Sequence, residues 1–517
     1  MDLSLFEQVK QIFASLSHSY KLHVTCNSAT DIGKEMIEFF TEFSDTSPKL
    51  GVEVTEANTD KAFMQLYRDD VPTGIIFRCI PGGHEFTSML LAILNADGQG
   101  KTLPDENTQN RIRCLKGDIS LITYVSLECT NCPDVVQALN QMALYNDRIT
   151  SETVDGNISV AEVEALGIKS VPTVYANGKE VWIGKGSLGE ILDKLEDEFG
   201  TEALEQSLPA RHFDLLVLGS GPAGSSAAIY SARKGLKVGI ISQNVGGQVR
   251  ETTDITNVIS VLKTTGEKLA GDLRSHLADS KVEIFDSRTI EEVDLKGEEK
   301  LVKVKGGEMF KAPRVVIATG AVWRRLNVPG ESDFIGHGVA FCVHCDGPFF
   351  AGKDVAVVGG GNSGVEAAID LANICHHVDL FEFLDVLKAD EVLQRKLRSL
   401  PNVDVHLLSA VTEITGKDGK LTGVEVKDRT NDTLHHFDVE GVFVQIGLLP
   451  NSDLFKNQVS VNNHGEIIID ACCRTDVPGV YAAGDVSTVP YKQIIVAMGE
   501  GAKAALSAFD DRTRSEG

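Results

Sequence analysis

The chain has 517 residues, of which 42% are hydrophobic and 24% charged, with a formal net charge of −25. That length indicates several domains, and the negative field argues against nucleic acid or an anionic membrane surface as a partner. The first residues lack a signal-peptide pattern, no run approaches the ~18 apolar residues of a membrane span, and ten cysteines are too few for a disulfide scaffold, so we expect a cytoplasmic protein.

The first 200 residues contain an internal repeat with an offset of 100 residues. Val71-Pro72-Thr73 recurs as Val171-Pro172-Thr173, and the strand-like Leu22-His23-Val24-Thr25 matches Ile122-Thr123-Tyr124-Val125. Each copy is expected to run strand, helix, strand, helix, Val-Pro-Thr strand, hairpin and terminal helix. The expected short helices cover residues 60–68 and 160–166, and the terminal helices cover 85–95 and 188–199. This order resembles a thioredoxin or glutaredoxin fold, predicted once at residues 1–100 and again at 101–197.

Only the second copy carries a Cys-x-x-Cys pair, Cys129 and Cys132. Such a pair can cycle between dithiol and disulfide, and the proline after Cys132 places Cys129 near a helix N-terminus, which favours its thiolate. Ala29 and Ile32 occupy the matching positions of the first copy, which we expect to be redox-inactive and retained for structure. Glu85 in that copy either lies beneath the pair and tunes its pKa values or begins a helix in solvent.

Residues 198–211 are polar with a glycine and a proline, which predicts a linker. From residue 213 apolar strands alternate with small-residue helices, an α/β pattern. A strand over residues 213–218 is followed at once by G-x-G-x-x-G, whose backbone N–H groups can hold a pyrophosphate at the start of the next helix. The residues of this first fingerprint are Gly219, Gly221, Pro222, Ala223 and Gly224. Gln243 stands where an acidic ribose ligand is expected.

A second fingerprint follows the strand over residues 355–358. Its residues are Gly359, Gly361, Asn362, Ser363 and Gly364. The next strand brings Glu382 near the expected ribose position, where a carboxylate accepts from a 2′-hydroxyl and repels a 2′-phosphate. The sequence therefore favours NADH over NADPH.

Three further segments complete a flavoprotein pattern. A strand over 315–317 ends in a turn able to approach the dinucleotide, a strand over 480–482 precedes a carboxylate for a ribityl hydroxyl, and a Gly-Gly-Gln turn could let the backbone approach a flavin ring. The candidate residues for FAD are Thr319, Gly320, Gly484, Asp485, Gly246, Gly247 and Gln248.

The second Cys-x-x-Cys pair, Cys342 and Cys345, lies just before the second fingerprint. A zinc site needs four ligands, and the two pairs are 213 residues apart with only His344 nearby, so we expect no metal. The predicted role is a redox dithiol, with the adjacent Asp346 as an acid/base during its reduction.

Together these motifs resemble the flavoprotein component, the F subunit, of bacterial alkyl hydroperoxide reductase, over essentially the whole chain. The stretches that carry the resemblance are Cys-Thr-Asn-Cys at 129–132, Cys-Val-His-Cys-Asp-Gly-Pro at 342–348, the second fingerprint, and residues 444–451 and 490–494. The resemblance implies an FAD-binding domain formed by residues 212–327 and 448–517, an NADH-binding domain at 328–447, and a homodimer.

The resemblance also implies a relay in which NADH reduces FAD, FAD reduces Cys342–Cys345, and that pair reduces Cys129–Cys132. The last pair then reduces the disulfide of a peroxiredoxin, the C subunit of alkyl hydroperoxide reductase. By similarity Cys345 faces the flavin, Cys342 attacks the N-terminal pair, Cys129 is the outward nucleophile and Cys132 resolves. Two alternatives remain open: a thioredoxin reductase fused to its own thioredoxin, and an NADH oxidase forming hydrogen peroxide whose N-terminal region docks a partner.

Overall fold

The computed structural model describes residues 3–59, 61–100, 103–168, 170–202, 209–252, 255–335, 337–417 and 420–516. The chain divides into two compact units. Unit 1 comprises Met1–Pro209 with two short later segments, Ser287–Thr289 and Val304–Glu308, and unit 2 comprises the remainder. Residues 203–208 of the predicted linker lie outside the described residues, and the predicted domain boundaries remain predictions.

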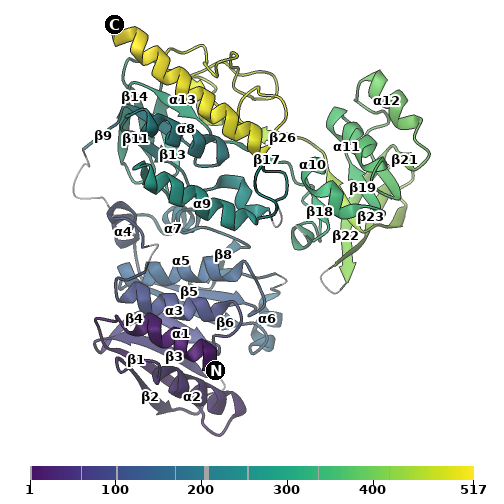
Figure 1. Cartoon of the computed structure of the whole chain (residues 1–517). Coiled ribbons are helices and arrows are strands. Elements are labelled where there is room, and N and C mark those ends of the chain that lie inside the picture. Colours follow the sequence, from purple (N-terminus) through teal and green to yellow (C-terminus); the bar gives the residue numbers. More distant parts are fainter. Residues whose placement is uncertain are drawn as a thin grey trace. The chain divides into compact units, whose positions relative to one another are not determined.

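Unit 1 is built on one eight-stranded sheet in the order β2-β1-β3-β4-β6-β5-β7-β8 (Figure 1). Its strands are β1 Tyr20–Cys26, β2 Leu50–Glu56, β3 Phe63–Arg68, β4 Val71–Arg78, β5 Ile119–Val125, β6 Ile149–Asp155, β7 Thr173–Ala176 and β8 Lys179–Ile183. Its helices are α1 Leu3–Phe13, α2 Asp31–Ser44, α3 Glu85–Ala96, α4 Glu106–Arg113, α5 Cys132–Tyr145, α6 Val160–Leu166 and α7 Leu188–Phe199.

The sheet consists of two copies of the same arrangement, which confirms the predicted tandem thioredoxin-like folds. In the first copy β1 pairs parallel with β2 and antiparallel with β3, which pairs antiparallel with β4. In the second, β5 pairs parallel with β6 and antiparallel with β7, which pairs antiparallel with β8. A parallel pairing of β4 with β6 joins the copies, and one buried apolar cluster extends through both.

The predicted helix over residues 60–68 is wrong, because Phe63–Arg68 forms β3 and residue 60 lies outside the described part. Met64 and Leu66 are buried while their neighbours are more exposed, the period-two alternation of a strand. A two-residue turn with positive φ at Asp69 and Asp70 then leads into β4.

This turn also corrects the proposed equivalence of the Val-Pro-Thr segments. The matching hairpin of the second copy turns at Asn177-Gly178, between β7 and β8. Val71-Pro72-Thr73 therefore begins β4, the counterpart of β8, whereas Val171-Pro172-Thr173 leads into β7. The repeat of the fold is real, but its register shifts after the second strand of each copy.

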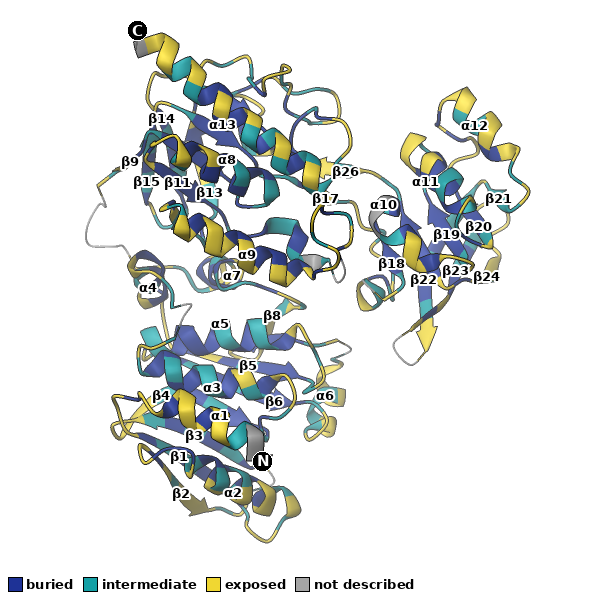
Figure 2. Ribbon diagram, viewed as in Figure 1, coloured by how far each residue is buried: buried dark blue, intermediate teal, exposed yellow. Residues whose placement is uncertain are grey.

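Unit 2 contains two five-stranded parallel sheets together with smaller antiparallel and mixed sheets. The first sheet has the order β12-β11-β10-β16-β27 and the second β18-β25-β19-β20-β21. Their strands are β10 Leu215–Leu218, β11 Val238–Ile241, β12 Glu283–Phe285, β16 Val315–Ile317, β27 Val480–Ala482, β18 Val339–Ala340, β19 Asp354–Val358, β20 His377–Phe381, β21 Val403–His406 and β25 Gly441–Val444. Their central strands are buried (Figure 2), as parallel strands covered on both faces require.

The remaining elements of unit 2 are helices and the strands of the smaller sheets. The helices are α8 Pro222–Arg233, α9 Gly266–Asp279, α10 Val343–Asp346, α11 Asn362–Ala372, α12 Glu391–Arg398 and α13 Ile494–Glu516, with 3-10 turns η1 Gly247–Glu251, η2 Ser332–Phe334, η3 Gly347–Phe350 and η4 Asp453–Phe455. The strands are β9 Arg211–His212, β13 Ile290–Asp294, β14 Lys300–Val304, β15 Met309–Ala312, β17 Ala321–Trp323, β22 Ser409–Lys417, β23 Lys420–Asp428, β24 Leu434–Asp438 and β26 Leu448–Pro450. Among the described residues, no helix is both long and apolar enough to span a membrane.

Candidate functional site

The dithiol of unit 1 lies at the start of α5. Cys132 is the first residue of this helix and is fully buried, whereas Cys129 is half-buried just before it. Both cysteines are free thiols here. The Cys129 sulfur lies 3.8 Å from the carbonyl oxygen of Val171, which precedes Pro172 through a cis peptide bond. The segment before β7 thus forms one wall of the site.

The two thiols differ in their readiness to ionise. A hydrogen bond from the Cys132 thiol, assisted by the backbone N–H groups of Asn131 and Cys132, lowers the pKa of Cys129 to about 6. The same hydrogen bond, followed by burial, raises the pKa of Cys132 far above its ordinary value. The accessible sulfur is therefore the thiolate and the buried sulfur keeps its proton, which suits Cys129 as nucleophile and Cys132 as resolving thiol.

Glu85 begins α3 in the first of the two thioredoxin-like folds and is fully buried, which excludes the solvent-exposed alternative. Neither of its carboxylate oxygens has a hydrogen-bond partner among the described residues. Burial, and then the negative charge of Cys129, raise the pKa of Glu85 to about 7, although the nearby Ser88 hydroxyl partly offsets the rise. The Glu85 charge in turn helps to raise the pKa of Cys132. The first fold therefore supplies a titratable group to the dithiol of the second.

The second cysteine pair lies in unit 2 at the short helix α10. Cys342 caps this helix and is disulfide-bonded, and Gln493 donates a hydrogen bond from Nε2 to its sulfur at 3.8 Å. The side chains of His344 and Cys345 lie outside the described part. Burial raises the pKa of Asp346 to about 6, so this carboxyl group can exchange a proton near neutral pH, as an acid/base beside a disulfide requires.

The first fingerprint forms the turn between β10 and α8. A Cβ on Gly219 would lie 2.2 Å from the carbonyl oxygen of Ala318, and a Cβ on Gly224 would lie 1.9 Å from that of Gly219. These two glycines therefore allow the strand, turn and helix to pack closely. A Cβ on Gly221, the N-cap of α8, would meet only the Gly246 carbonyl oxygen at 3.7 Å. The backbone at Gly221 is therefore open to a ligand. A dinucleotide-binding turn needs both kinds of glycine, those that allow close packing and one that leaves room for the ligand.

Other predicted FAD residues converge on this helix start. Gly247 lies close to Gly221, since an added Cβ would be 3.2 Å from the Gly221 Cα, and Gln248 follows Gly247 in η1. A Cβ on Gly484 would lie 2.8 Å from the Cβ of Ala223, the second residue of α8. Segments far apart in the sequence are thus gathered around one N-terminus.

The remaining predicted FAD contacts lie at the ends of β16 and β27. Thr319 exchanges hydrogen bonds with Asn451, from its hydroxyl to the Asn451 carbonyl at 2.7 Å and from Asn451 Nδ2 to its own carbonyl at 2.9 Å. Gly320 has positive φ and open space around a Cβ. Asp485 is half-buried, and burial raises its pKa while Lys492 partly offsets the rise. A buried carboxylate of this kind gains from a hydroxyl donor on a ligand.

The second fingerprint repeats this arrangement between β19 and α11. A Cβ on Gly359 would lie 2.4 Å from the carbonyl oxygen of Gln445, and a Cβ on Gly364 would lie 1.8 Å from that of Gly359. Gly361, the N-cap of α11, has nothing within 4 Å of an added Cβ. Two predicted cofactor residues, Asn362 and Ser363, form the first turn of this helix.

Glu382 follows β20 and is buried against the second fingerprint. Its carboxylate accepts hydrogen bonds from the backbone N–H of Gly360 and, at 2.8 Å, from that of Leu384. These contacts hold the carboxylate beside the helix start where the ribose of a dinucleotide is expected. The assignment of Glu382 and of the other cofactor residues to bound ligands remains a prediction.

Comparison with known proteins decides the family. Residues 213–501 match the model of the pyridine nucleotide-disulphide oxidoreductase family, and residues 120–197 match a thioredoxin domain model. The chain is 44% identical to the F subunit of alkyl hydroperoxide reductase from Pseudomonas putida, covering 100% of this chain and 99% of that protein. It is also 44% identical to the F subunit of the Escherichia coli (strain K12) enzyme, again over 100% of this chain and 99% of that protein. The chain belongs to the family of alkyl hydroperoxide reductase F subunits.

Solved structures are similar over part of the chain. Thioredoxin reductase from Streptococcus pyogenes MGAS5005 is 35% identical with a TM-score of 0.57, and the match covers 59% of this chain and 100% of that one. A further relative, 44% identical over 99% of each chain, is named NADH dehydrogenase in Bacillus subtilis (strain 168). The chain is thus an oxidoreductase that combines a pyridine nucleotide–disulfide reductase with a thioredoxin-like domain.

Proposed function

We propose that the chain uses NADH and FAD to reduce the disulfide of a peroxiredoxin, corresponding to the C subunit of alkyl hydroperoxide reductase, and so supports hydroperoxide detoxification. The observation that carries the proposal is the dithiol of unit 1. It presents a low-pKa thiolate, Cys129, at a partly exposed position with a protonated and buried thiol, Cys132, behind it. That arrangement suits attack on a disulfide of another protein.

Two observations support the proposed cofactors. Each of the two fingerprints has a glycine at a helix N-cap with open space for a close approach, at Gly221 and Gly361. The carboxylate at Glu382 favours a free 2′-hydroxyl and therefore NADH. When bound, the flavin would accept a hydride from the nicotinamide and pass the two electrons to a disulfide.

The steps carried by the protein's own sulfurs are thiol–disulfide exchanges. The reduced Cys342/Cys345 pair gives two electrons and two protons to the Cys129–Cys132 disulfide and becomes a disulfide itself. The Cys129 thiolate then attacks the partner disulfide, forming a mixed disulfide and releasing one partner thiolate, which takes up a proton. Cys132 loses its proton and attacks Cys129 of the mixed disulfide, which releases the second partner thiolate and re-forms the Cys129–Cys132 disulfide.

Glu85 is the group we propose to receive the proton that leaves Cys132. It is buried near enough to the dithiol that the charge of Cys129 raises its pKa and its own charge raises the pKa of Cys132, and its pKa of about 7 allows it to change protonation at neutral pH. Asp346, with its pKa of about 6, would do the same for the pair at Cys342.

We also propose a homodimer in the cytoplasm. The cytoplasmic location is supported by the six cysteines outside the two pairs, which are all free thiols, as a reducing compartment favours. The homodimer rests on the family alone. Its test is the molar mass of the purified protein in solution, where a monomer would contradict it.

A double variant, Cys129→Ser with Cys132→Ser, tests the proposed function. We expect it to keep NADH oxidation by oxygen and to lose NADH-dependent reduction of the peroxiredoxin. Retained peroxiredoxin reduction would show that the relay does not pass through unit 1. The relative named NADH dehydrogenase keeps an NADH oxidase as the second candidate, and this candidate is favoured if the unmodified protein oxidises NADH equally fast with and without the peroxiredoxin.

A further inference from the structure

Helix α6 leads into the wall of the Cys129 site, yet none of its residues is buried. Val163, and Ile168 just beyond the helix, pack only partly against the core, while Val160 and Leu166 are exposed. A helix of seven residues is not stable by itself. Apolar burial therefore accounts for only part of the position of α6.

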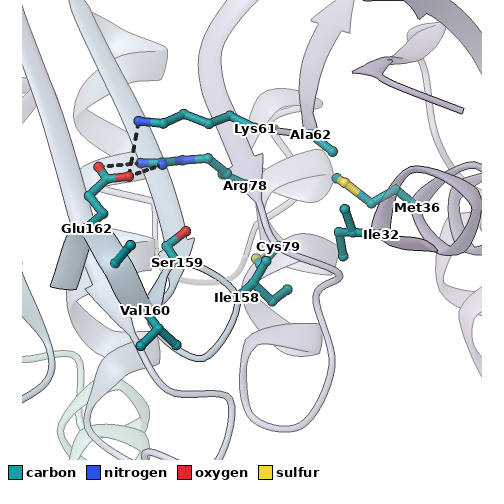
Figure 3. Close-up of a pocket in the computed structure, with 11 residues that line it drawn as sticks. Ile32, Met36, Lys61, Ala62, Arg78, Cys79, Ile158, Ser159, Val160 and Glu162 are labelled. Carbon is teal, nitrogen blue, oxygen red and sulfur yellow. Dashed lines mark hydrogen bonds and ion pairs between the residues drawn. The ribbon is translucent and has the colours of Figure 1, made fainter. Parts of the chain in front are cut away.

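A cluster of charges also holds the helix. The carboxylate of Glu162 on α6 accepts hydrogen bonds from both terminal nitrogens of Arg78 and, at 3.1 Å, from Lys61 Nζ (Figure 3). It also accepts a hydrogen bond from the Tyr124 hydroxyl at 2.6 Å. The Arg78 side chain is 6% exposed, and its Nε also donates to Glu152 at 2.6 Å. Arg78, more than any other group, lowers the pKa of Glu162 to about 2. Glu162 thus stays charged, and each charge in the cluster is paired.

The cations and the carboxylate come from different folds. Arg78 ends β4 and Lys61 precedes β3, both in the redox-inactive fold, whereas Glu162 belongs to the second fold. A cavity of about 160 Å³ lies beside them, lined by residues of both folds. Ile32, Met36, Ala62 and Cys79 line it from the first fold, and Ile158 to Glu162 line it from the second. Side chains do not fill this part of the junction, and beside the cavity the ion pairs of Arg78 and Lys61 with Glu162 link the two folds.

We propose that Arg78 and Lys61 are positioning residues for partner reduction, because they hold Glu162 and with it α6 and the segment beside Cys129. That segment places the Val171 carbonyl 3.8 Å from the Cys129 sulfur, so its position shapes the approach of an incoming disulfide. Exposed Val160 and Leu166 on α6 can contact a protein partner, whereas a small disulfide needs only the sulfur. The redox-inactive fold thus acts on substrate selection. This inference rests on the proposed function.

The test uses the full-length flavoprotein with Arg78→Met, Glu162→Gln and the conservative Arg78→Lys. We expect Arg78→Met and Glu162→Gln to raise the KM for oxidised peroxiredoxin by about tenfold and to change the rate with 5,5′-dithiobis(2-nitrobenzoate) by less than about twofold. Arg78→Lys should raise the KM less than Arg78→Met does, because lysine keeps the positive charge but cannot make the two-pronged contact with Glu162. Amide hydrogen exchange over residues 160–168 and 170–171 should accelerate in the first two variants.

Arg148→Met is the matched control, because Arg148 pairs with Glu202 at 3.1 Å elsewhere in unit 1. This variant should leave the KM for the peroxiredoxin, the rate with the small disulfide and the hydrogen exchange unchanged. Unchanged exchange in Arg78→Met would show that the cluster does not hold α6. If hydrogen exchange becomes faster but the KM for the peroxiredoxin is unchanged, the positioning role is wrong. It is also wrong if activity with the peroxiredoxin and activity with 5,5′-dithiobis(2-nitrobenzoate) fall by the same factor. If the unmodified protein fails to reduce the peroxiredoxin, the proposed function is wrong, while the exchange measurement still decides whether Arg78 holds α6.

Discussion

The hydrogen bond between the two thiols of unit 1 makes a quantitative prediction. It is the largest cause lowering the pKa of Cys129 from 9.0 to about 6. A difference of three pKa units corresponds to about 4 kcal/mol of thiolate stabilisation. Cys132→Ala removes the donor but keeps the backbone N–H groups at the start of α5. If the thiol supplies at least half of the effect, the pKa of Cys129 rises by at least about 1.5 units.

The assay is the pH dependence of iodoacetamide alkylation at Cys129 after reduction, followed on the peptide that contains this residue. At pH 7 the thiolate fraction should fall from about 90% to below about 25% in Cys132→Ala, with a matching fall in rate. The exposed free thiol of Cys472 provides an internal reference in the same sample.

Cys132→Ser is the matched control, because its hydroxyl can still donate to the Cys129 thiolate. We expect the pH midpoint of Cys129 alkylation in Cys132→Ser to lie nearer the midpoint of the unmodified protein than that of Cys132→Ala. If both variants keep a midpoint near 6, the helix start alone sets the pKa and the reasoning from the thiol pair is refuted.

Four further predictions concern titratable groups and the nucleotide site. Glu85→Gln should lower peroxiredoxin reduction by about tenfold and abolish the rise of the rate through pH 7 that follows loss of the Glu85 proton; an unchanged pH profile and an unchanged Cys129 titration would exclude a role for this carboxylate. The pKa of Glu85 in the folded protein, about 7, exceeds its ordinary value of 4.5. Ionisation of Glu85 therefore lowers the free energy of unfolding as the pH rises from 4.5 to 7. Hydrogen exchange in α3, measured over this pH range, should show that Glu85→Gln lacks this loss of stability. Asp346→Asn should slow reduction of the Cys342 disulfide by at least about tenfold in stopped-flow spectra, and an unchanged rate would remove Asp346 from the mechanism. Glu382→Gln should raise the KM for NADH by about tenfold and narrow the preference over NADPH; unchanged preference would show that Glu382 does not read the ribose.

Much of the fold could be predicted from local sequence. The ranges of α6 and α7 are those expected from the pattern, and both fingerprints lie in the predicted strand–turn–helix setting. The match to the second copy predicts a helix at residues 63–68, but these residues form β3, in which Met64 and Leu66 are buried between more exposed neighbours. Asp69-Asp70 was the sequence signal for the hairpin.

In unit 1 the residues around the dithiol were predictable mainly where they are neighbours in the chain. The spacing of Cys129 and Cys132 indicated the dithiol, whereas the burial of Glu85 near it depends on the packing of α3 beside α5. Arg78 and Glu162 were missed, since they are 84 residues apart and pair through the junction of two folds. No local pattern indicates such a pair, because charged residues are mostly solvent-exposed.

The central claim is that electrons pass through two disulfides beyond the flavin. Anaerobic reductive titration of the purified flavoprotein tests it most directly, since a flavin and two disulfides each accept two electrons. We predict uptake of six electrons per chain, and four in the Cys129→Ser, Cys132→Ser double variant. Uptake of only four electrons by the unmodified protein, or six by the variant, would contradict the relay.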